Sequence, residues 1–214
     1  LGEPEKAYKL IMSRNFHPWE GGEGKVTGQY VLSLNEMARK AIDQKEFKKA
    51  VEWLEKAQVY PENLGEGKLS GTQENEIYYW LGLAYEGLGN GEEARKYWQK
   101  ASSGLTEPSL AMFYNDQQPD TIFYQGLSLL KLGEKEKAEE RFNKLTRYGE
   151  THENDRVKID YFAVSLPDLL IWDADLDAQN HQLCQYLKGL GELGKGNNQN
   201  ASKLLGDVLK SNQA

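Results

Sequence analysis

The chain has 214 residues, a net charge of −7 at pH 7 and a hydrophobic content of 39%. An acidic chain without a basic stripe repels phosphate backbones, so we expect no nucleic-acid partner. No apolar run approaches the roughly 20 residues that a membrane-spanning helix needs, so we expect no membrane partner either.

Four alanines recur along the chain at nearly constant spacing. Ala7, Ala50, Ala94 and Ala138 are separated by 43, 44 and 44 residues, and each falls at the same place in a similar helical segment. A fixed period of this size is typical of stacked helical hairpins, in which no unit buries its apolar face alone. The pattern therefore predicts an all-α array. Because Ala7 belongs to a second helix whose first helix does not precede it, we expect a fragment of a longer protein.

In chain order, the pattern predicts a half-repeat over residues 1–15, then four helical hairpins, all within a single repeat domain over residues 1–214. The hairpins cover about residues 30–60, 75–104, 119–148 and 178–212. An insertion over residues 150–177 precedes the last hairpin, because Ala138 and its next equivalent, Ala201, are 63 residues apart.

The clearest hairpin carries a recognisable pattern. Its marked positions, in order, are Tyr78, Leu81, Gly82, Tyr85, Ala94, Trp98 and Ala101. They resemble the tetratricopeptide repeat (TPR), with the pattern W-x2-L-G-x2-Y followed by A-x3-F. We expect Gly82 to let the two helices approach closely. The resemblance implies a right-handed αα superhelix, here with long loops between repeats.

The period of 44 residues exceeds the usual 34 of a TPR, and the extra residues fall between hairpins. Two of these connectors contain sequence copies, Gly22–Gly28 and Gly65–Gly71, both beginning Gly-Glu-Gly-Lys. Neither forms a phosphate loop of the pattern G-x4-G-K-[ST], since Val26 and Leu69 follow the lysines. We expect structured connectors whose Glu and Lys tie the loops to neighbouring helices, with ligand contact by the loop rim as a secondary role.

A second resemblance concerns residues 17–25 and the insertion, whose segment 160–167 is too apolar for a free loop and is expected to pack onto the stack. These parts are similar to the C-terminal helical region of large bacterial multidomain proteins of the domain-of-unknown-function 5107 group. In that group a β-rich, carbohydrate-active-type portion precedes the TPR hairpins.

No catalytic, metal or cofactor site is expected from the sequence. Residues 173–177 resemble the start of a calcium loop, but Ala178 and Cys184 stand where the required glycine and glutamate belong. The three histidines lack metal-ligand spacing, and a single cysteine makes a structural zinc site improbable. We expect Cys184 to be a buried small hydrophobe.

The concave face of the array is the candidate binding surface. The repeat register assigns eight residues to it: Asn35, Arg39, Glu76, Tyr79, Asp120, Phe123, His181 and Lys188. Exposed aromatic rings among charged groups could hold a peptide or a carbohydrate. Alternatively, neighbouring loops fill the groove and the aromatics pack against them. The dicarboxylate clamp of the family is not reproduced, since Tyr79 and Phe123 occupy its sites.

These features favour a non-catalytic scaffold that binds a protein or peptide partner, or the N-terminal domains of its own full-length chain. The competing hypothesis is an accessory region of a bacterial carbohydrate-active enzyme, which shapes the active site or the dimer interface of that enzyme.

Overall fold

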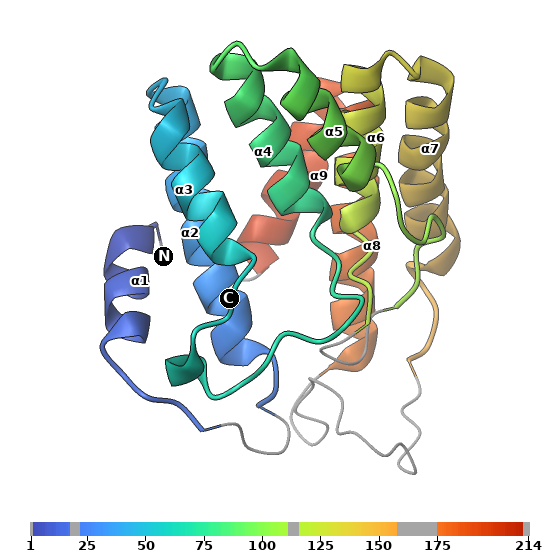
Figure 1. The fold of residues 1–214 in the computed structure, drawn as a ribbon. Helices are drawn as coiled ribbons and strands as arrows, with labels where there is room; N and C mark the ends of the chain where they lie inside the picture. Colours follow the sequence, from blue (N-terminus) through green and yellow to red (C-terminus); the bar gives the residue numbers. More distant parts are fainter. Residues whose placement is uncertain (1, 18–21, 111–115, 158–174, 212–214) are drawn as a thin grey trace. The chain divides into compact units, whose positions relative to one another are not determined.

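The computed structural model describes residues 2–17, 22–110, 116–157 and 175–211. Within these ranges it contains nine α-helices, one short 3₁₀ helix and no strand, which confirms the predicted all-α repeat class (Figure 1). None of the described helices is long and apolar enough to cross a membrane. The described chain forms two compact units, unit 1 up to Ala101 and unit 2 from Ser102 onward. The single domain predicted over residues 1–214 stays a prediction.

Unit 1 is a succession of helices in which each packs on the next along the chain, and α2 also packs on α4. Its elements are α1 (Pro4–Met12), α2 (Lys25–Asp43), α3 (Phe47–Ala57), the 3₁₀ helix η1 (Glu62–Leu64), α4 (Asn75–Gly87) and α5 (Gly91–Ala101). This pattern of contacts is the one expected when helical hairpins stack in sequence order.

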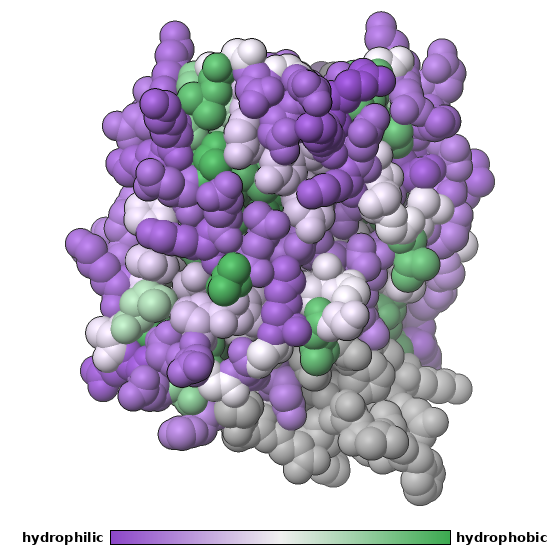
Figure 2. Space-filling model, viewed as in Figure 1, coloured by the Kyte–Doolittle hydropathy of each residue, from purple (hydrophilic) through white to green (hydrophobic). Residues whose placement is uncertain are grey.

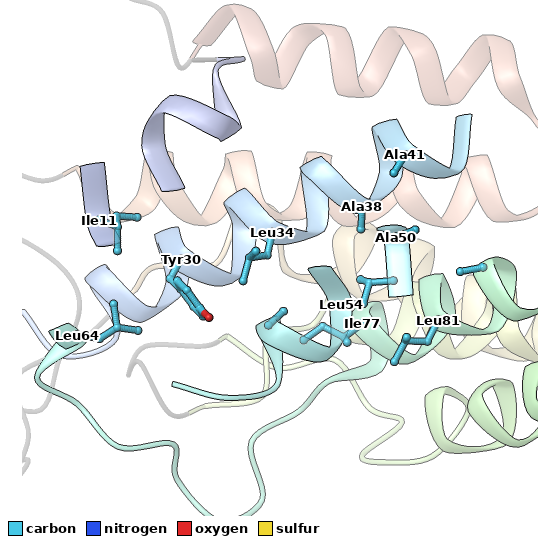
Figure 3. Close-up of a cluster of buried hydrophobic side chains, with 12 residues drawn as sticks. Ile11, Tyr30, Leu34, Ala38, Ala41, Ala50, Leu54, Leu64, Ile77 and Leu81 are labelled. Atoms are coloured by element: carbon cyan, nitrogen blue, oxygen red, sulfur yellow. The ribbon is translucent and has the colours of Figure 1, made fainter. Parts of the chain in front are cut away.

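The core of unit 1 gathers apolar side chains from four helices and from the connector that contains η1 (Figure 3). Leu34 of α2, Leu54 of α3 and Leu81 of α4 are fully buried. Leu64 of η1 joins the same cluster with only 1% of its surface exposed. The connector between α3 and α4 is therefore part of the core.

Unit 2 repeats the arrangement with two further hairpins. Its helices are α6 (Thr121–Leu132), α7 (Lys135–His152), α8 (Leu176–Gly194) and α9 (Asn198–Ser211). Ile122, Phe142 and Leu187 form the centre of its core. Of the predicted insertion, residues 158–174, which include the apolar segment 160–167, lie outside the described residues.

Three of the four alanines that define the period lie at buried helix contacts, as predicted, and so does Ala201. Ala50, Ala94 and Ala138 are each 0% exposed, and Ala201 is 1% exposed. Ala7 is only half-buried.

The predicted role of Gly82 is also confirmed, and it recurs in unit 2. A Cβ atom added to Gly82 would lie closer than 3.0 Å to the indole of Trp98, and one added to Gly126 would meet the ring of Phe142 in the same way. The two pairs are offset by 44 residues, so one hairpin contact is built twice. In each hairpin a glycine on the first helix makes room for an aromatic ring of the second.

The two Gly-Glu-Gly-Lys copies adopt different backbones. The first copy enters a helix, because Gly24 takes a left-handed conformation at φ 76° and α2 begins at Lys25. The second copy leaves η1 at Gly65, also at φ 76°, and does not become helical before α4. The copies therefore share a sequence but not a conformation.

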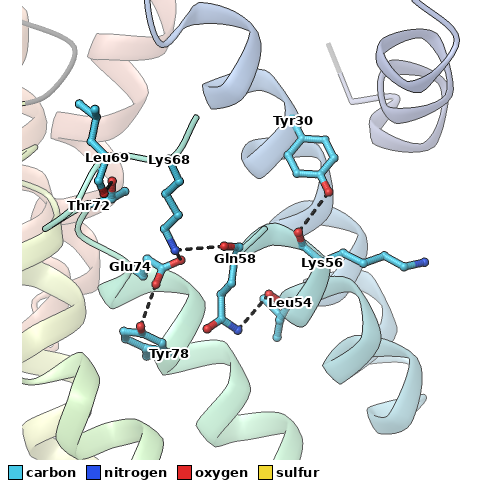
Figure 4. A network of polar contacts seen from close by, with 9 residues as sticks. All are labelled: Tyr30, Leu54, Lys56, Gln58, Lys68, Leu69, Thr72, Glu74 and Tyr78. Atoms are coloured by element: carbon cyan, nitrogen blue, oxygen red, sulfur yellow. Dashed lines mark hydrogen bonds and ion pairs between the residues drawn. The ribbon is translucent and has the colours of Figure 1, made fainter. Parts of the chain in front are cut away.

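The second copy is tied to its neighbours by its charged side chains, as expected. Both carboxylate oxygens of Glu66 accept from the backbone N–H of Gly24, at 3.1 and 3.0 Å. Lys68 Nζ donates to the carbonyl of Gln58 at 3.1 Å and pairs with Glu74 at 2.5 Å (Figure 4). The connector thus contacts the start of α2, the end of α3 and the start of α4.

In unit 2, the connector that precedes α6 is held by a buried amide. Gln125 is 0% exposed, and its Nε2 donates to the carbonyl of Leu105 at 2.9 Å. Its Oε1 accepts from Arg141 Nε at 3.1 Å. Because burying an amide without partners is costly, these two bonds fix the connector against α6 and α7.

The face of the molecule seen in Figure 2 is mainly hydrophilic, and its hydrophobic residues lie singly or in small groups. This agrees with a chain in which 28% of the residues are charged. Scattered apolar residues of this kind are normal on a protein surface and do not mark a site.

Candidate functional site

The eight residues assigned to the concave face are divided between the two units. Unit 1 holds Asn35 and Arg39 on α2, with Glu76 and Tyr79 on α4. Unit 2 holds Asp120 at the start of α6, Phe123 on α6, and His181 and Lys188 on α8.

In unit 1, three of the four predicted residues surround Trp80, which the register did not select. The guanidinium carbon of Arg39 lies 5.1 Å from the centroid of the Trp80 ring. Trp80 Nε1 donates to Glu76 Oε1 at 3.3 Å. The ring of Tyr79 meets that of Trp80 edge-on, with centroids 5.1 Å apart. We call the group of Glu36, Arg39, Glu76, Tyr79 and Trp80 the Trp80 surface.

The helix period explains why these groups meet. Glu76 and Trp80 are four residues apart on α4, and Glu36 and Arg39 are three apart on α2, so each pair shares a helix face. The packing of α2 on α4 then brings the Arg39 guanidinium over the indole. This spacing of Glu76 and Trp80 was the signal in the sequence that could have revealed Trp80.

The Trp80 surface combines accessible charges with aromatic rings that are only partly exposed. Arg39 pairs with Glu36 at 2.5 Å, and their side chains are 44% and 39% exposed. Burial raises the pKa of Tyr79, and the charge of Glu86 adds to the effect, so the phenol stays neutral at physiological pH. The surface holds two carboxylates, those of Glu36 and Glu76, and one guanidinium, that of Arg39.

The expectation that Asn35 presents a surface amide is corrected by the structure. Asn35 is only 2% exposed, although it lies one helical turn before Arg39. Its Oδ1 has no hydrogen-bond partner in the described part of the chain. Asn35 therefore lies beneath the surface and not on it.

The expectation of an exposed Phe123 is likewise corrected. Phe123 is 9% exposed, and its ring packs against Phe142 at a centroid distance of 6.0 Å and against Tyr124 at 5.6 Å. It is a core residue of unit 2. Asp120 contacts α8, since it accepts from Tyr186 Oη at 3.5 Å.

His181 and Lys188 contact the end of α7. Lys188 Nζ pairs with Glu153 Oε2 at 2.6 Å, and His181 Nδ1 lies 3.3 Å from the backbone oxygen of Glu153. Gln185 Nε2 donates to the same carboxylate at 3.0 Å. Because α7 continues to His152, beyond the predicted end at residue 148, Glu153 lies beside α8. These side chains tie α8 to α7.

The described residues contain no cluster of three or more His, Cys, Asp or Glu side chains placed to hold a metal ion. Of the calcium-like segment, Asp175 accepts from the backbone N–H of Ala178 at 3.0 Å and so caps α8, while Asp173 lies outside the described residues. Burial raises the pKa of the Cys184 thiol to about 11, as expected for a cysteine that packs as a small hydrophobe.

The hairpin geometry agrees with a family comparison. Residues 76–102 and 120–150 match the tetratricopeptide repeat. Both segments resemble TPRs. They contain the two hairpins in which a glycine faces an aromatic ring. No solved structure matches the chain.

TPRs generally serve as protein-interaction scaffolds that bind proteins or peptides, and they are typically non-catalytic. That general role is the one the comparison supports. The resemblance to the 5107 group stays a prediction.

Proposed function

We propose that this chain is a non-catalytic scaffold that binds a protein or peptide partner through the Trp80 surface of unit 1. The observation that carries the proposal is the gathering of Arg39, Glu76 and Tyr79 around one indole ring. Aromatic side chains bury a large area at low entropic cost, and partly exposed Trp, Tyr and Arg are enriched where proteins bind.

The charges of the surface indicate the chemistry of the partner. The two carboxylates, Glu36 and Glu76, outnumber the one guanidinium, Arg39, and the whole chain carries −7. A segment with a basic side chain next to an apolar one would pair with the carboxylates and cover the indole. Such a segment can belong to another protein or to another domain of the full-length chain.

Two other hypotheses, a carbohydrate ligand and an accessory region of an enzyme, have less support. Carbohydrate would also stack on Trp80, and its hydroxyls would donate to the carboxylates, but a neutral sugar would gain no charge pairing from them. The role of an accessory region in a carbohydrate-active enzyme depends on residues outside this chain.

The experiment is a selection from a random-peptide phage library on the immobilised chain, followed by calorimetric titration of the enriched peptides. We expect the enriched peptides to combine a basic side chain with an aromatic or aliphatic one. We expect Tyr79→Ala and Glu76→Gln each to weaken binding by about tenfold, the loss of one good contact. The matched control is Glu52→Gln, which removes an exposed carboxylate from α3.

Circular dichroism of each variant establishes that the helices are intact. The proposal fails if no peptide is enriched, or if the enriched peptides bind the Tyr79 and Glu76 variants as tightly as the unmodified chain.

A further inference from the structure

An apolar groove lies in unit 2, between α8 and α9. It has a volume of about 550 Å³. Its lining residues are Gln179, Gln182, Leu183, Tyr186, Leu205, Val208 and Leu209. We call it the α8–α9 groove. It is separate from the Trp80 surface, which belongs to unit 1.

The preceding hairpin shows what such a groove accommodates. The ring of Phe142 on α7 lies between two glycines, Gly126 of α6 and Gly194 of α8, since a Cβ on either would overlap it. Leu205 is the equivalent of Phe142, 63 residues later. On one side it meets Gly189, the equivalent of Gly126, where an added Cβ would lie 2.7 Å from Leu205 Cδ2. Its other side lines the groove.

Two further groove residues have equivalents that contact α8. Leu209 corresponds to Thr146, whose Oγ1 would overlap a Cβ on Gly191 of α8. Leu183 corresponds to Asp120, which accepts from Tyr186 of α8. The α8–α9 groove is therefore equivalent to the surface of α6 and α7 on which α8 packs, so it is suited to contact with a further helix. Among the described helices of unit 2, α9 packs mainly on α8.

The charge of the groove indicates what packs there. Its lining contains no ionisable group except the phenol of Tyr186. Three other described grooves are each lined by several Lys, Glu or Arg side chains. Two copies of a chain with a net charge of −7 repel each other over most of their surface. At the lining of this groove they bring no like charges together.

The groove offers both a projecting leucine and less exposed apolar side chains beside it. Leu209 protrudes from one rim and is 64% exposed, while Leu183 and Leu205 border the hollow beside it. A two-fold interface requires one patch that supplies both a projecting group and a recess. Leu209 of each copy can enter the hollow of the other.

We propose that the α8–α9 groove is a homodimer interface, in which the α8–α9 hairpin of a second copy packs its own groove against this one. The contact is isologous, and apolar burial drives it.

The test is sedimentation equilibrium of the whole chain from about 1 to about 100 μM, the range in which modest interfaces associate. We expect the apparent mass to rise from monomer to dimer. Gln182→Glu keeps the side-chain shape and adds a charge to each face, and Leu209→Glu removes the projecting group. Each should raise the dissociation constant at least tenfold while the helical circular dichroism is unchanged.

The matched control is Leu10→Glu, which alters a leucine of α1 that is 58% exposed in unit 1. It should leave the dimer unaffected. A chain that stays monomeric at every concentration overturns the proposal. This holds even if a helix of a different protein binds in the groove. A dimer that both groove variants leave unchanged overturns it as well.

Discussion

Gly82 lies against the indole of Trp98, so close that a methyl group on Gly82 would come within 3.0 Å of the ring. Trp98 is 6% exposed, so the ring has little room to move away. This single contact sets the distance between α4 and α5. It also explains why the shortest residue and one of the largest recur together in the repeat.

We predict that Gly82→Ala lowers the free energy of unfolding by about 1–3 kcal/mol, the usual cost of overpacking a buried contact. The measurement is urea unfolding followed by circular dichroism. The control is Gly28→Ala, in the first turn of α2, where an added Cβ meets nothing within 4 Å. That variant should gain up to about 1 kcal/mol from the better helix propensity of alanine. Equal effects of the two substitutions would contradict the close approach.

We predict that Glu66→Gln destabilises unit 1 by about 0.5–2 kcal/mol, the usual range for loss of a helix N-terminal cap. Glu66 accepts from Gly24 and from Thr27 Oγ1, the latter at 3.2 Å, and its charge lies at the positive end of α2. Glutamine keeps one acceptor and loses the charge. Glu62→Gln, an exposed carboxylate of the same connector, is the control. If both variants unfold at the same urea concentration, Glu66 is not a cap.

We predict that stability falls as the pH rises above about 10. Burial raises the pKa of Tyr78 to about 12, with a contribution from its hydrogen bond to Glu74, and burial raises the pKa of Tyr30 to about 12. In the unfolded chain both phenols have a pKa near 10. Between these values the folded state holds more protons, so the free energy of unfolding decreases with pH.

Urea unfolding at a series of pH values between about 8 and 11 measures this fall. Tyr78→Phe should make the fall shallower, because phenylalanine cannot ionise in either state. A pH dependence identical to that of the unmodified chain would mean that Tyr78 titrates normally in the fold.

The sequence predicted the hairpin contacts well because they depend on local period. Ala94 and Gly82 must be small wherever two helices cross closely, and that requirement is visible in the spacing alone. The concave face was predicted less well. The register placed Asn35 and Phe123 on an open surface, but both are buried.

The errors have a physical origin in the parts that do not repeat. Lys188 meets Glu153 because α7 runs past the predicted end of its hairpin, and no periodic signal marks that extension. The two Gly-Glu-Gly-Lys copies differ because Leu64 is held in the core next to the second copy, while the first runs directly into α2. Tertiary contacts of this kind override a shared local sequence.

Arrays in which each repeat contacts only its neighbours can lose their ends one at a time as they melt. The connector between α3 and α4 works against such fraying. Asn63 Nδ2 donates to the carbonyls of Ile11 and Arg14, and Glu66 accepts from the backbone N–H of Gly24, directly before α2. Opening α1 therefore breaks bonds to residues about fifty positions away. The N-terminal helices should consequently exchange their amide hydrogens as one cooperative block.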